Sequence, residues 1–197
     1  MKKIFFLSLV SILLLAGCGN NDYTPKPVAY LRFDFPPKEY AAYDTAALPF
    51  TFERATNANV SVKKNERRDK WVDVLYPDYK GVVFLSYKPL AGPQDLRGQI
   101  DTSYELLKMH FDYSSGVDEN NYVDPRNRVY ATTYLLKGSN VASTYQFWVT
   151  DSVNHFLRGS LYLDCTPNND SLAPVLDYLQ KDLVHLLETL RWREYHA

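Results

Sequence analysis

Alternation of apolar and polar residues predicts several strands in the first half of the chain. In residues 30–35 (YLRFDF), the side chains of Leu31, Phe33 and Phe35 share one face, and Pro36-Pro37 ends the pattern. Four more stretches alternate in the same way or are rich in β-branched and aromatic residues: 49–54, 59–64, 70–77 and 81–90. A turn-like segment, PDYKG, joins the last two stretches.

Two later stretches have the spacing of helices. After Gly92-Pro93, four apolar residues recur four or seven positions apart with Tyr104 between them, which predicts an amphipathic helix: Leu96, Ile100, Leu107 and Phe111. Between residues 172 and 190 a broad apolar stripe predicts a helix of about five turns that covers a sheet. The stripe consists of Leu172, Val175, Leu176, Leu179, Leu183, Leu186, Leu187 and Leu190.

The segments between these helices complete the expected architecture. Residues 117–127 (VDENNYVDPRN) are predicted to form a polar loop, and three strands are expected at 128–137, 142–150 and 155–164. Strands and helices are segregated along the chain, which indicates the α+β class with a mostly antiparallel sheet flanked by helices. The order of elements resembles the PsbP/Mog1-like fold, in which a central antiparallel sheet lies between helices.

The N-terminus has the pattern of an export signal. Lys2 and Lys3 precede an almost unbroken apolar run, which is too short for a transmembrane helix and is typical of a signal peptide. The run ends in LAGC, which resembles the bacterial lipobox, where the cysteine is acylated and the chain is cut before it. We therefore expect a lipoprotein signal peptide at 1–17, the acylated Cys18 and a tether at 18–28, and a single globular α+β domain at 29–197. The alternative is an ordinary signal peptide that happens to be followed by a cysteine.

Composition and charge limit the classes of partner. Apolar residues make up 46% and aromatic residues 15% of the chain, enough to build a core. Cleavage before Cys18 removes two lysines and no acids, so the formal net charge changes from −1 to −3. This charge argues against nucleic acid and leaves the lipid as the attachment to the membrane. No cofactor is expected besides the lipid on Cys18. With Cys18 acylated, Cys165 has no disulfide partner and is expected to be a half-buried strand residue.

The stretch DSVNHFLRG (residues 151–159) combines residue types found in hydrolytic sites. Asp151 and Ser152 are common in turns, and Asn154 suits a left-handed turn position. A catalytic triad needs a histidine between nucleophile and acid, and the strained GxSxG turn is not present. We therefore favour a structural turn in which His155 caps a strand, over a partner-binding edge and a hydrolytic site.

The expected hairpin has a definite register. We place Thr150 opposite His155, Trp148 opposite Leu157, Gln146 opposite Gly159, Val149 opposite Phe156 and Phe147 opposite Arg158. The candidates for contact with a protein partner are Gln146, Trp148, His155 and Arg158.

Other chemistry has little support in the sequence. The four histidines, His110, His155, His185 and His196, lack the spacing of metal ligands. Neither CxxC pairs nor glycine-rich phosphate loops occur. We therefore assign no catalytic and no metal-binding residues. The 16 tyrosines could form a sugar-binding or protein-binding surface, but strand positions explain them more simply.

Several blocks of the sequence together resemble the GldD family of gliding-motility lipoproteins from Bacteroidota. They are YTPKP, PFTFE, WVDVLYP, LSYKPL, ASTYQFWVTDSVNHFLRGSLY, PNNDSLAPV and LETLRW, in this order along the chain. Members of this family often carry a cysteine before the PF pair, where this chain has Leu48, so Cys165 has no partner there either.

The resemblance implies a non-enzymatic, membrane-anchored protein of the cell envelope. It would face the periplasm and support gliding motility or type IX protein secretion. Independently of the resemblance, Gly19 after the cysteine, in place of an aspartate, favours the outer membrane over the inner. The expected partners of the protein are the membrane, through the lipid, and other envelope lipoproteins or components of the secretion system. The alternative function is a periplasmic solute-binding or hydrolytic lipoprotein, which a deep pocket with convergent polar groups would favour.

Overall fold

The computed structural model describes residues 34–63 and 69–193, all of which belong to one compact unit, Leu31–Ala197. The described residues form an α+β fold with antiparallel sheets, as the sequence predicted. The larger sheet has seven strands in the order β3-β4-β5-β9-β8-β7-β6. Their bounds are β3 Asn59–Lys63, β4 Lys70–Tyr76, β5 Gly81–Pro89, β6 Gly116–Asp124, β7 Val129–Lys137, β8 Tyr145–Thr150 and β9 His155–Leu163.

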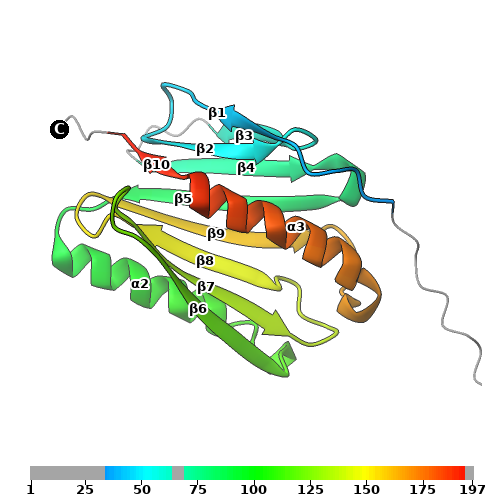
Figure 1. Ribbon diagram of the computed structural model, residues 1–197. Coiled ribbons are helices and arrows are strands. Elements are labelled where there is room, and N and C mark those ends of the chain that lie inside the picture. Colours follow the sequence, from blue (N-terminus) through cyan, green and yellow to red (C-terminus); the bar gives the residue numbers. More distant parts are fainter. Residues whose placement is uncertain (1–33, 64–68, 194–197) are drawn as a thin grey trace, which may run out of the picture. The chain divides into compact units, whose positions relative to one another are not determined.

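One face of this sheet is covered by the long helix α3 (Asn169–Thr189) and by a small sheet (Figure 1). The small sheet has the order β1-β2-β10 and consists of β1 (Tyr40–Tyr43), β2 (Phe50–Ala55) and β10 (Arg191–Trp192). Leu179 and Leu183 of α3 join Phe50 and Phe52 of β2 in the main core, together with side chains of the large sheet. The apolar stripe of the last predicted helix is thus the core-facing side of α3.

The opposite face carries the helix α2 (Pro93–Lys108), which packs on β8 and β9 (Figure 1). Its N-cap is Gly92, and its Pro93 occupies the first turn, as predicted. Leu107 packs into a small second core with Leu136, Val141 and the partly buried Trp148. Because Ser103 and Leu107 are the buried residues of α2, this helix covers its face much less completely than α3 does.

Alternation along the strands gives each face of the large sheet its own chemistry. On β9, Leu157 and Leu161 point into the main core, whereas Arg158 and Tyr162 lie on the α2 face. The cross-strand partners follow the same rule, since Val83 lies opposite Leu161 and Ser86 lies opposite Arg158. The α2 face is therefore the more polar of the two.

One prediction of local structure is wrong, and a second is wrong where the structure describes it. Residues 116–124 form β6 rather than a polar loop, because an edge strand needs backbone pairing on one side and can leave most of its side chains in water. In residues 30–35, positions 34 and 35 are not in a strand, and positions 30–33 lie outside the described residues. Phe35 instead stacks on Tyr178 of α3, at 4.6 Å between ring centroids.

Cys165 also differs from expectation, because it is exposed and lies beyond the end of β9. The chain turns there, where the Asp164 amide donates to the carbonyl oxygen of Lys80 and the Cys165 amide donates to that of Leu163. The PsbP/Mog1-like arrangement stays a prediction.

Candidate functional site

The turn between β8 and β9 is organised by the buried carboxylate of Asp151. Its Oδ1 accepts hydrogen bonds from the backbone amides of Val153, Asn154 and His155, at 2.8–2.9 Å. Ser152 takes the left-handed conformation at φ 71°, not Asn154 as predicted. The side chain of Ser152 is exposed, whereas Asp151 and His155 are buried. These contacts explain the polar residues of the turn as elements of its structure.

The observed register differs from the predicted one by one residue. Thr150 lies opposite Phe156, Trp148 opposite Arg158, and Gln146 opposite Ser160. The reason is that five residues, Asp151 to His155, separate the last paired positions, Thr150 and Phe156. Three of their backbone amides bond to the carboxylate of Asp151 rather than across a tight turn. Val149 therefore shares the core face with Leu157, and Phe156 lies on the α2 face against Trp148.

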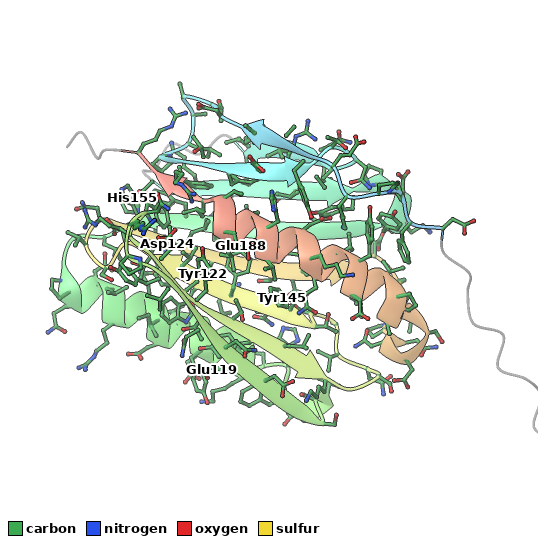
Figure 2. All side chains as sticks on the ribbon, viewed as in Figure 1. Glu119, Tyr122, Asp124, Tyr145, His155 and Glu188 are labelled. Carbon is green, nitrogen blue, oxygen red and sulfur yellow. The ribbon has the colours of Figure 1, made fainter. Side chains whose placement is uncertain are left out.

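His155 holds the C-terminal strand onto the end of the sheet. Its ring stacks on Trp192 of β10 at 4.9 Å between centroids, and its Nδ1 lies 2.9 Å from the hydroxyl of Tyr87. Burial lowers the pKa of His155, and the backbone hydrogen bond to Arg193 and the charge of Asp151 oppose this shift in part. Figure 2 shows His155 at the end of the sheet beside β10. The histidine therefore packs the turn against β10 and has a structural role.

The four predicted partner-binding residues lie in three environments. Gln146 and His155 are each 2% exposed, so neither presents its side chain at the surface. Trp148 is half-buried beneath α2. Arg158 is half-buried as well, and it lines a cavity of the surface.

This cavity, of about 430 Å³, lies between the end of α2 and β9. It is lined by Leu106, Met109, His110, Tyr113, Asn140, Ala142, Arg158 and Tyr162. Nη2 of Arg158 donates to Oε1 of Gln146 at 2.7 Å, which fixes the guanidinium. Among the described residues no carboxylate forms a salt bridge with Arg158. The lining therefore combines one cation with apolar and aromatic side chains.

The electrostatics of the cavity follow from burial. Burial lowers the pKa of Arg158, the nearby Tyr162 opposes that shift, and an arginine stays charged at any ordinary pH. Burial also lowers the pKa of His110, and the positive charge of Arg158 adds to that shift. At neutral pH the imidazole of His110 is accordingly uncharged, and the cavity carries a single positive charge.

An exposed aromatic surface adjoins the cavity, on the part of the sheet that α2 leaves open. We call it the sheet patch, and it consists of Trp71, Leu75, Val82, Phe84 and Tyr162. Trp71 is 49% exposed, Phe84 41% and Leu75 37%. Tyr162 belongs to both the cavity and the sheet patch. The centroid of its ring lies 5.7 Å from that of Phe84 and 6.3 Å from that of His110.

A second polar cluster surrounds the buried carboxylate of Asp182 on α3. Lys38 Nζ lies 2.6 Å from Asp182 Oδ1, and the hydroxyl of Tyr40 lies 3.0 Å from the same oxygen. Burial lowers the pKa of Lys38, while the hydrogen bond and the charge of Asp182 oppose that shift. Lys38 also lies over the ring of Tyr178, 3.1 Å from its centroid. This cluster fixes the N-terminal part of the described chain to α3, and sequence reasoning missed it because its members are 144 positions apart.

Sequence reasoning also missed most of the sheet patch. The signal was present, since Trp71, Leu75 and Phe84 occupy the positions between the core residues of two strands. Apolar side chains on both faces of a strand indicate either a covered sheet or an exposed binding surface. The pattern alone could not show that α2 stops short of these strands.

Two absences apply to the described residues alone. No helix within residues 34–63 and 69–193 has the length and apolarity needed to cross a membrane. The same residues contain no cluster of three or more histidine, cysteine, aspartate or glutamate side chains that could hold a metal ion. Cys18 lies outside the described residues, as does the whole predicted signal peptide and tether.

The fold and the site define an antiparallel α+β protein whose distinctive surface is aromatic and adjoins a cationic cavity. Residues 20–192 match the family described as gliding motility lipoprotein GldD, so the chain belongs to this family. The match confirms the resemblance seen in the sequence blocks. It implies a part in gliding motility and a membrane-anchored place in the envelope, in a family not known for enzymes. A search of curated proteins found no match.

Proposed function

We propose that the chain is a non-enzymatic lipoprotein, anchored through Cys18, that docks other proteins of the gliding and type IX secretion machinery. It faces the periplasm, preferentially from the outer membrane. The family match over residues 20–192 supports a role in motility. The LAGC sequence at the end of the apolar N-terminal run supports lipidation. The partners are other envelope lipoproteins or secretion components.

The observation that carries the docking role is the sheet patch. Large apolar side chains scattered singly over a surface are common, but Trp71, Leu75 and Phe84 are neighbours on paired strands. Aromatic residues are enriched in the centres of protein interfaces, and a polar rim surrounds them. Within the patch, Asp73 lies opposite Phe84 and forms an ion pair with Lys63, whose ammonium lies 5.7 Å from the centroid of the Phe84 ring. The patch thus combines large apolar side chains with one ion pair.

The docking role is tested by changing the patch without changing the core. Phe84→Ser and Trp71→Ser remove exposed aromatic surface, and each should reduce colony spreading and secretion in the native organism. Val184→Ser is the matched control, because Val184 is 38% exposed on α3, outside the patch. Protein level and melting temperature are measured for all three variants. Normal spreading of both patch variants, at normal protein levels, would refute docking through this surface.

Anchoring is tested separately at the cysteine. Cys18→Ser should leave an uncleaved precursor without lipid, because processing of this signal type requires the thiol. Mass spectrometry of the membrane fraction gives the mass of the processed chain and of its acyl groups. A Cys18→Ser chain that is still cut before residue 18 and still fractionates with membranes would contradict the proposal.

The alternative function, a solute-binding or hydrolytic lipoprotein, is supported by a cavity of the surface. The cavity beside Arg158 has a volume of about 430 Å³, within the range of small-molecule sites. Its polar groups do not include a nucleophile paired with a base among the lining residues. The cavity therefore supports binding of a small molecule more than hydrolysis.

A further inference from the structure

The cavity at the end of α2 contains a cation whose charge the described residues leave uncompensated. A charge that is taken out of water normally pairs with an opposite charge, because desolvation is costly. Arg158 is half-buried, and its one hydrogen-bond partner within residues 34–63 and 69–193 is the neutral Oε1 of Gln146. A guanidinium offers five N–H donors, so most of them stay available to a ligand.

The surroundings of Arg158 restrict the chemistry of that ligand. No acidic side chain lines the cavity, and Lys108, the lysine of α2, pairs with Glu105. His110 is neutral at neutral pH, so a ligand meets one positive charge rather than two. A singly charged carboxylate matches this charge, whereas a phosphate, with nearly two charges, would stay partly uncompensated. Leu106, Met109 and Tyr113 provide an apolar rim for the group that carries the carboxylate.

We propose that Arg158 binds the C-terminal carboxylate of the docked protein, whose last residue is apolar or aromatic and fills the cavity beside Tyr162. This inference rests on the proposed docking function and names the chemistry of the partner. A protein is favoured over a free solute because Tyr162 belongs both to the cavity and to the sheet patch. A partner that covers the patch therefore reaches Arg158 with the same surface.

The test uses the purified mature lipoprotein in detergent micelles and three soluble probes. N-acetylphenylalanine carries an aromatic group and a free carboxylate, its carboxamide lacks the charge, and inorganic phosphate lacks the apolar group. Binding is followed by NMR through the imidazole resonances of His110, which lines the cavity. We expect saturable binding of the carboxylate with a Kd on the order of 1 mM, since a fragment has few contacts. The carboxamide and phosphate should each bind about tenfold more weakly or not at all.

Four variants assign the effect to Arg158. Arg158→Gln should weaken binding of the carboxylate by about tenfold or more, and Arg158→Lys should restore part of it, because a lysine keeps the charge but not the planar fork. Arg97→Gln is the control, since Arg97 is exposed on α2 and does not line the cavity. Met109→Asp covers the case in which Arg158→Gln fails to fold. Met109 is 70% exposed at the rim, so a carboxylate there repels the probe without disturbing the core.

The outcomes separate this inference from the docking function. Equal binding of acid and carboxamide, or binding that neither Arg158→Gln nor Met109→Asp weakens, would overturn the inference. A Kd of about 10 μM or tighter for a free acid would also overturn it, because such affinity for a fragment indicates a solute-binding protein. If the probes fail while Phe84→Ser abolishes spreading, docking stands and the carboxylate inference falls.

Discussion

The side chain of Asp151 stabilises the β8–β9 turn, because it accepts hydrogen bonds from backbone amides of the turn. Three consecutive amides point at one carboxylate oxygen, and Oδ2 lies 3.5 Å from Nη2 of Arg128. Hydrogen bonds to a charged acceptor are stronger than bonds between neutral groups. The side chain therefore sets the length of the turn, and through it the register of the two strands.

Asp151→Ala should destabilise the protein by about 3 kcal/mol or more, because it removes one acceptor from three amides, one of them buried. Ser152→Ala should change the free energy of unfolding by about 0.5 kcal/mol or less, since its side chain is exposed. Ser152→Gly should stabilise the turn slightly, because residue 152 has a positive φ. Urea denaturation of the three variants measures all three effects. A loss for Ser152→Ala as large as that for Asp151→Ala would contradict this account of the turn.

Because of His155, the free energy of unfolding should decrease as the pH falls below neutral. Burial lowers its pKa in the folded state, so the unfolded chain binds the proton more readily than the folded chain. Its contribution to stability is complete above the unfolded pKa of about 6.5 and decreases as the pH falls below that value. Asp151 and Arg128 face the ring with opposite charges, and Tyr87 contributes its hydroxyl.

The melting temperature should therefore fall between pH 7 and pH 5. In His155→Gln, which cannot titrate, the slope over this range should be smaller, although the variant is less stable at pH 7. His110 has the same sign of shift, so His110→Gln provides the comparison. An unchanged slope in His155→Gln would mean that this residue does not set the dependence.

Among the elements, β6 shows how a strand can have the composition of a loop. Its backbone pairs with β7 over nine positions, while its side chains are mostly exposed, including the Asp118 that pairs with Lys137. Acidic side chains on an edge strand prevent pairing with other chains. Tyr122, labelled in Figure 2, is half-buried and packs against the main core. Burial raises its pKa, and the charges of Asp124 and Glu188 add to that shift.

The pairing of β8 with β9 depends on a glycine. A Cβ atom on Gly159 would lie 2.2 Å from the ring of Phe147, which is the cross-strand neighbour and is buried. Phe147 thus occupies the space above the glycine, an arrangement known to stabilise glycines in strands.

Gly159→Ala should destabilise the protein by about 2 kcal/mol or more, because neither the ring nor the strand can move freely in the core. Gly98→Ala is the matched control. No atom lies within 4 Å of the added Cβ, and alanine at this position of α2 should stabilise the helix by about 0.5–1 kcal/mol. Thermal unfolding of the two variants compares them directly, and equal melting temperatures would refute the packing argument.

At the scale of the described unit, contacts distant in sequence join its first and last parts. Strand β2 pairs with β1 on one side and with β10 on the other, so the two ends of the described chain meet in one small sheet. Lys38 and Asp182 add an ion pair between the N-terminal segment and α3. The unit is therefore held together by contacts that the local pattern of apolar and polar residues does not predict.

Lys38→Met should destabilise the protein by about 3 kcal/mol, because it leaves the carboxylate of Asp182 buried without its cation. The Lys108–Glu105 pair is exposed, so Lys108→Met should cost about 0.5 kcal/mol or less. Chemical denaturation at pH 7 gives both values. If Lys38→Met were as mild as Lys108→Met, the Asp182 cluster would contribute little to the fold.

The sequence predicted the parts of this molecule that depend on periodicity. Helix α3 was predicted because its leucines recur at helical spacing, and strands β2, β5 and β9 because they alternate or are rich in β-forming residues. The register around Asp151 was not predictable, since a single side-chain contact shifts it by one residue. Arg158 was recognised as a candidate, but its cavity depends on where α2 ends relative to β9. Burial of Gln146 and His155 likewise follows from tertiary packing.

The most direct test of the central claim asks whether the sheet patch contacts a partner in living cells. A photo-crosslinking amino acid is placed at Phe84, at Trp71, or at Val184 on the other face, and the adducts are identified by mass spectrometry. We predict one discrete adduct with an envelope protein from positions 84 and 71, lost in the Phe84-substituted chain that also carries Arg158→Gln. Position 184 should give none. An adduct from position 184 alone, or none from either patch position in cells that glide, would contradict docking through this surface.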